Sequence, residues 1–469
     1  MPDQTIVLEG TLRAEQEKSF VHLPFDLPAG TVRLHVAYTY GDKIGADLGR
    51  TGGNTIDLGV FDARGIDFLT AGFRGWSGSE RSSFFITETE ATPGYLAGAL
   101  MPGRWHVLLG AYKLHPAGCS YHVTITISTR AAEDRQSNCA VNLQSLSSGD
   151  LPCSAPRAPY APWLRGELHC HSWHSDGDRD AVAVVRLAYQ RGLDFLAITD
   201  HNTTASQREL ANLHNPGLIL MRGVETTTYK GHFNIWGIPD WVDFRIQSPE
   251  EMQAAIQFAN ERSAVTSCNH PEPFGPPWDY ESVTNYHCIE VWNGPWSLRN
   301  QIALDFWIKR LEYGQCIPAI GGSDWHRQKE MEAKTPRTLG TPTVWVYVPG
   351  TPTASAILDA IRRGHITLSA EPNGAFVALR SGGDLPALGG DRLPRPADGR
   401  LTIQIHCQRG EGCQLQLLDQ TGELYRQDIA IADTTITTEV SVRESWYVRA
   451  ELRTPYGSLQ AMTNPLYLQ

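Results

Sequence analysis

Histidine and acidic residues follow several short apolar segments in the middle of this chain. The first segment is a strand expected over residues 166–170, which leads into His169-Cys170-His171. Side chains alternate between the two faces of a strand, so the two histidines point the same way and can reach one ion. Asp176 follows on a loop short enough to bring a carboxylate oxygen to that ion. This spacing is typical of a metal site.

Further candidate ligands follow later apolar segments in the same way. They are His201, Glu225, His232, His270, Asp324 and His326. A single buried histidine is more often a packing residue than a ligand. Six histidines and three carboxylates at the ends of neighbouring strands would be costly to bury unless cations neutralised them, so the whole set indicates metal binding. Mixed imidazole and carboxylate ligands suit Zn²⁺, Mn²⁺ or Fe²⁺, and the sequence does not select among these ions.

The strands that carry these residues alternate with predicted helices. Ser248 as N-cap and Pro249 in the first helical position predict a helix that runs to about Arg262. Apolar spacing predicts two more helices, over 180–191 and over 297–313, each followed by a glycine. Strands that alternate with helices indicate a parallel α/β barrel, in which active sites lie at the carboxyl ends of the strands.

The chain divides into four segments by composition. Residues 1–130 show short alternating runs broken by glycine and proline, which predict an N-terminal β-sandwich. Residues 131–163 are polar and proline-spaced, typical of a linker. Residues 164–374 form the predicted barrel, and residues 375–469 return to strands in a C-terminal β-rich domain. We favour structural cover as the role of the two β-domains, with partner or polymer binding, shaping of the cleft mouth and a dimer surface as alternatives.

Composition excludes some classes of protein. The chain has 40 Lys+Arg against 51 Asp+Glu, a net charge of −11, which argues against general nucleic-acid binding. No apolar run approaches the roughly 18 residues of a membrane helix, so we expect no membrane partner. The N-terminus lacks the pattern of a secretory signal, and the nine cysteines are odd in number and scattered. These features predict a cytoplasmic protein with reduced thiols.

The segments HCHSWHSDG, ITDHN, GVE with a downstream GH, NHP and GGSDWH resemble the successive motifs of the PHP (polymerase and histidinol phosphatase) metallohydrolases. The resemblance covers roughly residues 164–370. The segments LGTPTVWVYV, IRRGHITLSAEPNGAFVAL and AMTNPLYL are similar to the carbaryl-hydrolase-like branch of that superfamily. One position departs from the pattern, because His365 stands where an arginine is expected, and a substrate contact there is not carried over.

The resemblance implies a distorted (β/α)7 TIM-like PHP barrel that holds two or three divalent metal ions (Zn, Mn or Fe). Glu225 would be the bridging carboxylate. The residues that match the ligand positions are His169, His171, Asp176, His201, Glu225, His232, His270, Asp324 and His326.

Such a site predicts a hydrolase in which a metal-bound hydroxide attacks the substrate. We expect a small-molecule phosphate ester as substrate. Hydrolysis of a carboxylic or carbamate ester by the same centre is the alternative, and a non-catalytic metal-containing binding protein is a second one. A homo-oligomer is also compatible with the sequence. No GxSxG elbow surrounds a serine, and Cys170 should point away from the ligands as a packing thiol.

Other residues near the ligands are candidates for catalysis. His174 is expected either to protonate the leaving group or to orient a ligand, and Asp200 to fix a ligand histidine or to bind the metal itself. Arg327, like Arg222 and Arg337, is expected either to clamp a phosphate or to be a surface or ion-paired arginine.

Aromatic residues and one further acid also follow these strands. Glu290 stands at a strand end. Trp292, Trp296 and Trp325 are expected either to line a substrate pocket or, more commonly for tryptophan, to belong to the core.

Overall fold

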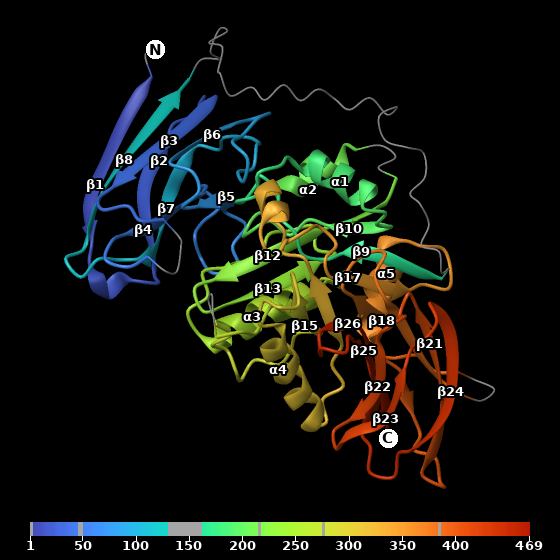
Figure 1. Cartoon of the computed structure of the whole chain (residues 1–469). Coiled ribbons are helices and arrows are strands. Elements are labelled where there is room, and N and C mark those ends of the chain that lie inside the picture. The colour runs from blue at the N-terminus through green and yellow to red at the C-terminus, as the bar shows by residue number, and fades with distance from the viewer. Residues whose placement is uncertain (1–2, 46–49, 130–161, 214–216, 274–276, 383–385) are drawn as a thin grey trace.

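The computed structural model of this chain describes residues 3–45, 50–129, 162–213, 217–273, 277–382 and 386–469. The N-terminal strands lie at one end of the molecule and the C-terminal strands at the other, with the helices and the central strands between them (Figure 1). The linker expected over 131–163 falls almost entirely outside the described residues. The predicted division into domains stays a prediction.

The N-terminal region consists of two antiparallel four-stranded sheets with one shared core. The strand orders are β1-β8-β3-β6 and β2-β7-β4-β5. The core contains Val36 and Ile125 from the first sheet and Val60 and Val107 from the second, each fully buried. Burial alternates along β3, as the alternation of apolar residues in the sequence predicts. The strands are β1 (Gln4–Leu12), β2 (Phe20–Leu27), β3 (Arg33–Tyr40), β4 (Thr55–Phe61), β5 (Phe73–Gly78), β6 (Ser83–Thr87), β7 (Gly103–Lys113) and β8 (Cys119–Ser128).

The central strands are divided between two sheets. Strands β11-β10-β9-β17-β18 begin a sheet of eleven strands, and β12-β13-β14-β15-β16 form a sheet of five. The strands are β9 (Trp163–Glu167), β10 (Phe195–Ala197), β11 (Ile219–Met221), β12 (Gly223–Thr228), β13 (Gly231–Trp236), β14 (Val265–Cys268), β15 (Cys288–Asn293), β16 (Ala319–Gly322), β17 (Thr343–Tyr347) and β18 (Ile366–Ser369). Two isolated parallel bridges, Cys170↔Trp325 and His201↔Glu225, link the sheets beside the candidate ligands.

This arrangement differs from the expected barrel of parallel strands. The single strand expected over 218–224 is two strands, of which β11 pairs with β10 while β12 turns into an antiparallel hairpin with β13. Strand β17 is also antiparallel to β9. The fold is therefore mixed α/β and rich in strands, and the closed (β/α)7 barrel is not confirmed. The ligand-bearing strand expected over 166–170 lies three residues earlier, because β9 spans Trp163–Glu167, so His169 and His171 follow the strand and are not part of it.

Helices form where capping residues predict them. Helix α3 (Pro249–Asn260) begins after Ser248, whose side chain accepts a hydrogen bond from the Glu251 N–H. Helix α1 (Ala181–Gln190) begins after Asp180, which caps it in the same way. Helix α4 (Asn300–Glu312) begins three residues later than expected, because Arg299 has a left-handed backbone with φ of 67°. The remaining helices are α2 (Ala205–Ala211), α5 (Ala354–Arg363) and the 3-10 turns η1 (Ala14–Gln16) and η2 (Gln328–Glu332).

The C-terminal strands extend the eleven-stranded sheet and add a second sheet of three strands, β19-β21-β24. A separate core, which includes Ile403, Leu417 and Leu452, fills the space between them. The strands are β19 (Phe376–Ser381), β20 (Arg392–Leu393), β21 (Arg400–Gln408), β22 (Gln414–Asp419), β23 (Gly422–Asp428), β24 (Asp433–Ser441), β25 (Tyr447–Arg453), β26 (Leu459–Thr463) and β27 (Leu466–Leu468).

Two smaller predictions also have an outcome in the structure. All of the cysteines that lie in the described residues are free thiols. Within the same residues, every helix is too short or too polar to span a bilayer.

Candidate metal centre

The nine predicted ligands come together in one cluster. Eight of them form three overlapping groups. Within each group, the nitrogen and oxygen atoms that could bind a metal lie within 4.8 Å of one another. The groups are His171, Asp176, His201 and His326; then His169, Glu225 and His270; then His169, His171 and Asp324. The ninth residue, His232, places Nδ1 3.2 Å from Glu225 Oε1. The structure therefore brings together every residue that the sequence predicts as a metal ligand.

Glu225 lies at the middle of this cluster, on β12. Its carboxylate is 3.3 Å from His169 Nε2, 2.9 Å from His201 Nδ1 and 3.5 Å from His270 Nε2. Only 1% of the Glu225 surface is exposed, so its charge is compensated by these imidazoles and not by water. This position fits the bridging role predicted for it.

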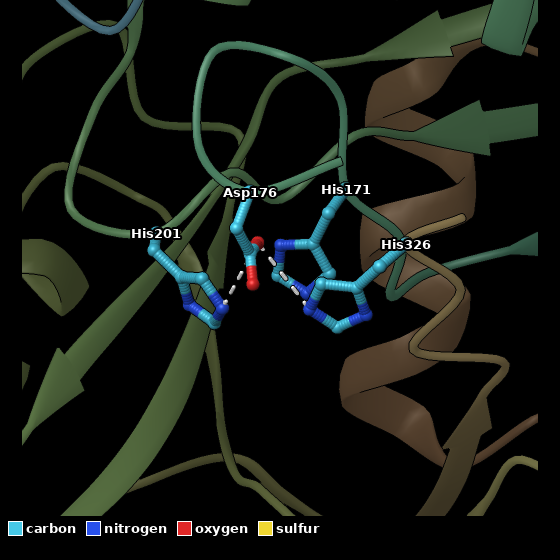
Figure 2. A group of neighbouring side chains, drawn as sticks. All are labelled: His171, Asp176, His201 and His326. Carbon is cyan, nitrogen blue, oxygen red and sulfur yellow. Dashed lines mark ion pairs between the residues drawn. The ribbon is translucent and has the colours of Figure 1, made fainter. Parts of the chain in front are cut away.

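Asp176 forms the centre of the first group (Figure 2). Its Oδ1 atom lies 3.6 Å from His201 Nε2 and 3.4 Å from His326 Nε2, one histidine on each side. The rings of His171 and His326 are stacked with centroids 4.0 Å apart. Four side chains from three segments, with His171 and Asp176 on one loop, thus present lone pairs to one small volume.

The separations and the hydrogen bonding both fit divalent ions. Two ligand atoms that each lie about 2.1 Å from a tetrahedral ion are about 3.4 Å apart, close to the distances around Glu225 and Asp176. His169 Nε2, Asp176 Oδ1 and His232 Nε2 are buried without a hydrogen bond. Because unpaired buried polar atoms are costly, these free lone pairs are best explained as metal ligands.

The charges of the cluster shift the pKa values of its members in opposite directions. Burial raises the pKa of Asp176, but His326, His201 and His171 outweigh it and lower that pKa to about 2. Burial lowers the pKa of His201, but Glu225 and Asp176 outweigh it and raise that pKa to about 9. Burial together with His326 and His201 lowers the pKa of His171 to about 4. The carboxylates are therefore ready to bind cations, whereas His201 must first lose a proton.

Several residues that do not belong to the nine hold them in place. Glu290, noted from the sequence only as a strand-end acid, lies with Oε1 2.8 Å from His169 Nδ1 and accepts a hydrogen bond from the His270 N–H. Asn269 donates to Glu225 Oε1 at 3.0 Å. Partners of this kind fix the orientation of ligand side chains and keep their metal-binding atoms directed at the ion.

Glu167 and Gly322 have positioning roles that sequence reasoning missed. The buried Glu167 carboxylate accepts hydrogen bonds from the N–H groups of His169, Ser323 and Gly340, and so joins β9 to the segment that follows β16. A Cβ atom at Gly322 would lie 2.3 Å from His169 Cβ and 2.9 Å from Glu290 Oε1. The motif IPAIGGSDWH contained this signal, because a glycine just before a ligand suggests close packing.

Two ligands lie on left-handed backbone. The φ angles are +50° at Asp324 and +25° at His270, in a region that residues other than glycine rarely adopt. Arg337 holds the first of these segments, because its guanidinium donates to the carbonyls of Ser323 and Asp324 and pairs with Asp324 Oδ2 at 2.8 Å. Strained backbone of this kind is concentrated at functional sites.

Asp200 acts on the loop between two ligands. Its carboxylate accepts hydrogen bonds from the Ser172 N–H, the Ser172 hydroxyl and the Ser175 hydroxyl. These bonds shape the loop that joins His171 to Asp176. Asp200 is thus placed to position ligands, and its oxygens point to serines and not to a ligand histidine.

His174 and Arg327 face the N-terminal sheets. His174 Nδ1 accepts a hydrogen bond from the Gly94 N–H, and Nε2 donates to Glu209 at 2.8 Å. Arg327 donates to the Asp176 carbonyl and pairs with Glu80 at 3.6 Å. The structure therefore does not bring His174 into the cluster and brings Arg327 only to the backbone of a ligand.

The remaining candidates lie elsewhere. Arg222 is exposed at the start of the hairpin, and His365 pairs with Asp391 at 2.8 Å. Trp292 and Trp325 are fully buried in the core, as the commoner interpretation of tryptophan predicts, and Trp296 packs against Trp292. Cys170 is buried as well, and burial raises the pKa of its thiol, which suits a packing residue.

Comparisons with known proteins give limited similarity. No model of a known protein family matches the chain. A stretch of 64 residues, 13% of this chain, is 41% identical to a 5'-3' exoribonuclease from Haemophilus influenzae, and the match spans only 23% of that protein.

Solved structures with which the chain aligns include a two-domain protein from Bacteroides vulgatus that contains a predicted PHP-like metal-dependent phosphoesterase. That alignment has 18% identity and a TM-score of 0.38, and it covers 67% of this chain and 98% of the other. An amidohydrolase from Chromobacterium violaceum aligns with 17% identity and a TM-score of 0.27, over 35% of this chain and 88% of the other.

Proposed function

We propose that this chain is a metal-dependent hydrolase that cleaves a phosphate ester at the cluster around Glu225. The observation that carries the proposal is the convergence of nine imidazole and carboxylate side chains, several of which have buried atoms without hydrogen bonds. Divalent ions bound there would supply an activated water and neutralise negative charge on the substrate oxygen.

The residues of the chain have distinct tasks in this proposal. Glu225 and Asp176 supply the anionic oxygens that hold the ions. Glu290 keeps His169 in its binding orientation, and Asp200 fixes the loop that carries Asp176. Arg337 supplies a cationic side chain that pairs with Asp324 Oδ2 at 2.8 Å.

Charge favours an anionic substrate. The three overlapping groups contain three carboxylates, Asp176, Glu225 and Asp324, so three divalent ions would leave the cluster with a net positive charge. A positive centre in a buried site attracts the phosphate group of an ester more strongly than an uncharged carbonyl. We therefore place phosphate esters ahead of carbon esters, and a small-molecule ester is the partner that we propose.

A carboxylic or carbamate ester is the second candidate. One observation favours it, because a cavity beside the cluster is lined by Phe20, Trp76, Tyr112, Tyr229 and Phe244, and its lining, within the described residues, has no lysine or arginine. A carbamate with an aromatic leaving group would suit such a cavity without needing a cationic clamp.

The deciding experiment compares two substrates on one metal-reconstituted preparation. We expect bis-p-nitrophenyl phosphate to be hydrolysed faster than 1-naphthyl N-methylcarbamate. Asp324→Asn, which keeps the size of the side chain but removes its charge, is the matched inactive control for both substrates. Faster cleavage of the carbamate would transfer the assignment to carbon esters. Tightly bound metal without turnover of either substrate would favour a non-catalytic binding protein.

A further inference from the structure

A cavity of about 230 Å³ lies between the candidate metal centre and the N-terminal sheets. Its floor includes three of the predicted ligands, Asp176, His201 and His232. Its opposite wall is the sheet β2-β7-β4-β5, and each of the four strands contributes one large or acidic side chain. These are Phe20, Tyr112, Asp57 and Trp76, in that strand order. The N-terminal region therefore does more than cover the centre.

The wall is fixed to the central region by specific contacts. The Tyr229 hydroxyl donates to Asp57 Oδ2 at 2.7 Å, which links the hairpin β12-β13 to β4. The Thr203 hydroxyl donates to the Gly94 carbonyl at 2.9 Å, and the Leu69 N–H donates to Asp243. Because Asp57 and Tyr229 themselves line the cavity, and the other two contacts join the same two regions, the wall is held in place without a ligand.

Aromatic rings form most of the lining. Phe20 stacks on Tyr229 with centroids 5.1 Å apart and planes at 12°, and Tyr112 lies 5.3 Å from the same ring. Trp76 packs against Phe244 at 4.5 Å. Phe20, Tyr112 and Tyr229 are only partly buried, so their rings retain surface for a further ring. Rings arranged in this way favour a planar aromatic group through offset or edge-on contacts.

The charges of the lining disfavour an anionic group. Lysine and arginine are absent from the lining, all of which belongs to the described residues. Asp57 is buried, and burial outweighs its hydrogen bond from Tyr229 and raises its pKa to about 7. Glu80 also lines the cavity and is paired with Arg327. The lining therefore offers no cation to hold a phosphate group, and such a group is directed to the metal side.

We propose that this cavity binds a planar aromatic group of the substrate, so that the sheet β2-β7-β4-β5 selects aromatic esters for the adjoining centre. The inference rests on the proposed hydrolase function, and it names the substrate class: esters that carry an aryl group or a nucleobase. The aromatic ring lies against Phe20, Tyr112 and Tyr229, while the ester bond lies at Asp176 and His201.

Binding without turnover tests the proposal. Isothermal titration of the full chain with 1-naphthol, adenosine and cyclohexanol compares a simple aryl group, a nucleobase and a non-aromatic ring. We expect one of the two aromatic probes to bind at least about tenfold more tightly than cyclohexanol. Tighter binding of adenosine identifies a nucleobase as the aromatic source, and tighter binding of 1-naphthol identifies a simple aryl group. Equal affinity for all three probes, or no binding of any, overturns the proposal.

Variants locate the binding. Phe20→Ala and Tyr112→Ala should each lower the affinity for the aromatic probe by about tenfold. Phe85 is a half-buried aromatic residue of β6 outside the cavity, so Phe85→Ala should leave that affinity unchanged. Ser79→Trp fills the cavity from its partly exposed rim and should abolish binding without removing any packing contact. Unchanged affinity in the folded cavity variants overturns the proposal. Absent hydrolysis with intact aromatic binding would instead contradict the proposed function.

Discussion

The candidate metal centre and the aromatic wall beside it hold their side chains by different forces. In the centre, the buried Glu225 and the partly buried Asp324 lie among imidazoles, and Asn269 and Arg337 fix them. In the wall, Phe20 and its neighbours are held by ring packing, with Asp57 as the single buried carboxylate. The two regions meet at one cavity. The difference suggests a division of labour, in which the centre provides the chemistry and the wall provides selectivity.

If the centre provides the chemistry, a substitution of one of its ligands should cause the largest loss of bound metal and of hydrolysis. Glu225→Gln keeps the size of the side chain but removes the charge that five histidines surround, so we expect bound metal and hydrolysis to fall by more than about a hundredfold. Metal content by mass spectrometry and the rate kcat give the two readouts. Glu332→Gln, an exposed glutamate on η2, is the matched control. Full metal content in Glu225→Gln would remove Glu225 from the ligand set.

The next largest effect is expected from a residue that touches a ligand but is not one. Glu290→Gln weakens the charged contact to His169 Nδ1, and we expect metal affinity to fall by about 10- to 100-fold with the fold unchanged. Metal titration of the chelated protein measures this affinity. Glu281→Gln lies on the surface and should have wild-type affinity. Equal affinity of both variants would show that Glu290 does not orient His169.

A substitution next to the ligands should lower both the free energy of unfolding and the affinity for metal. The Cβ atom of Gly322→Ala would collide with His169 and Glu290, so we expect about 1–3 kcal/mol lower free energy of unfolding and weaker metal binding. Gly350→Ala meets no atom within 4 Å and has no positive φ angle, which makes it a matched control. Denaturant unfolding of the metal-free proteins measures the difference. A Gly322→Ala variant as stable as Gly350→Ala would mean that the site has room at this position.

The pH dependence of metal binding tests the centre without any substitution. The pKa of His201 is raised to about 9, so this imidazole is protonated at neutral pH in the metal-free protein and must lose its proton to bind an ion. Metal affinity should therefore rise with pH, by at least about tenfold per unit between pH 7 and 9, because neighbouring carboxylates also raise the pKa values of the ligands His169 and His270. Calorimetry in buffers of different ionisation enthalpy reports the released proton. Affinity that stays constant over this range would exclude His201 as a ligand.

The ligands of the centre could be predicted from sequence because they are chemically rare and follow strands at restricted spacings. His169 and His171 are expected on one face of a strand. Strand β9 ends before them at Glu167, yet both imidazoles reach Asp324 Oδ1, at 3.4 and 3.0 Å. The later ligands follow recognisable motifs. Positioning residues were harder to predict. Glu167 and Asn269 have ordinary residue types, and their roles depend on which backbone groups the fold brings near them.

The sheet pairing and the cavity could not be predicted for a related reason. The apolar run 218–224 reads as one strand, but the chain changes partners between β11 and β12. Phe20 and Tyr112 look like ordinary strand residues of a β-sandwich, and nothing local indicates that a surface more than fifty residues away in sequence will turn them into a cavity wall. Strand pairing and the cavity wall therefore depend on long-range packing, which the local sequence pattern does not specify.

Reversible removal of the metal tests the central claim most directly. The purified chain is treated with a strong chelator, dialysed, and supplied again with Mn²⁺ or Zn²⁺, while bound metal and hydrolysis of bis-p-nitrophenyl phosphate are measured at each step. We expect two or three ions per chain at the start, loss of hydrolysis with the ions, and recovery with their return. Hydrolysis that persists after the chelator has removed the ions would contradict a metal-dependent mechanism at this centre.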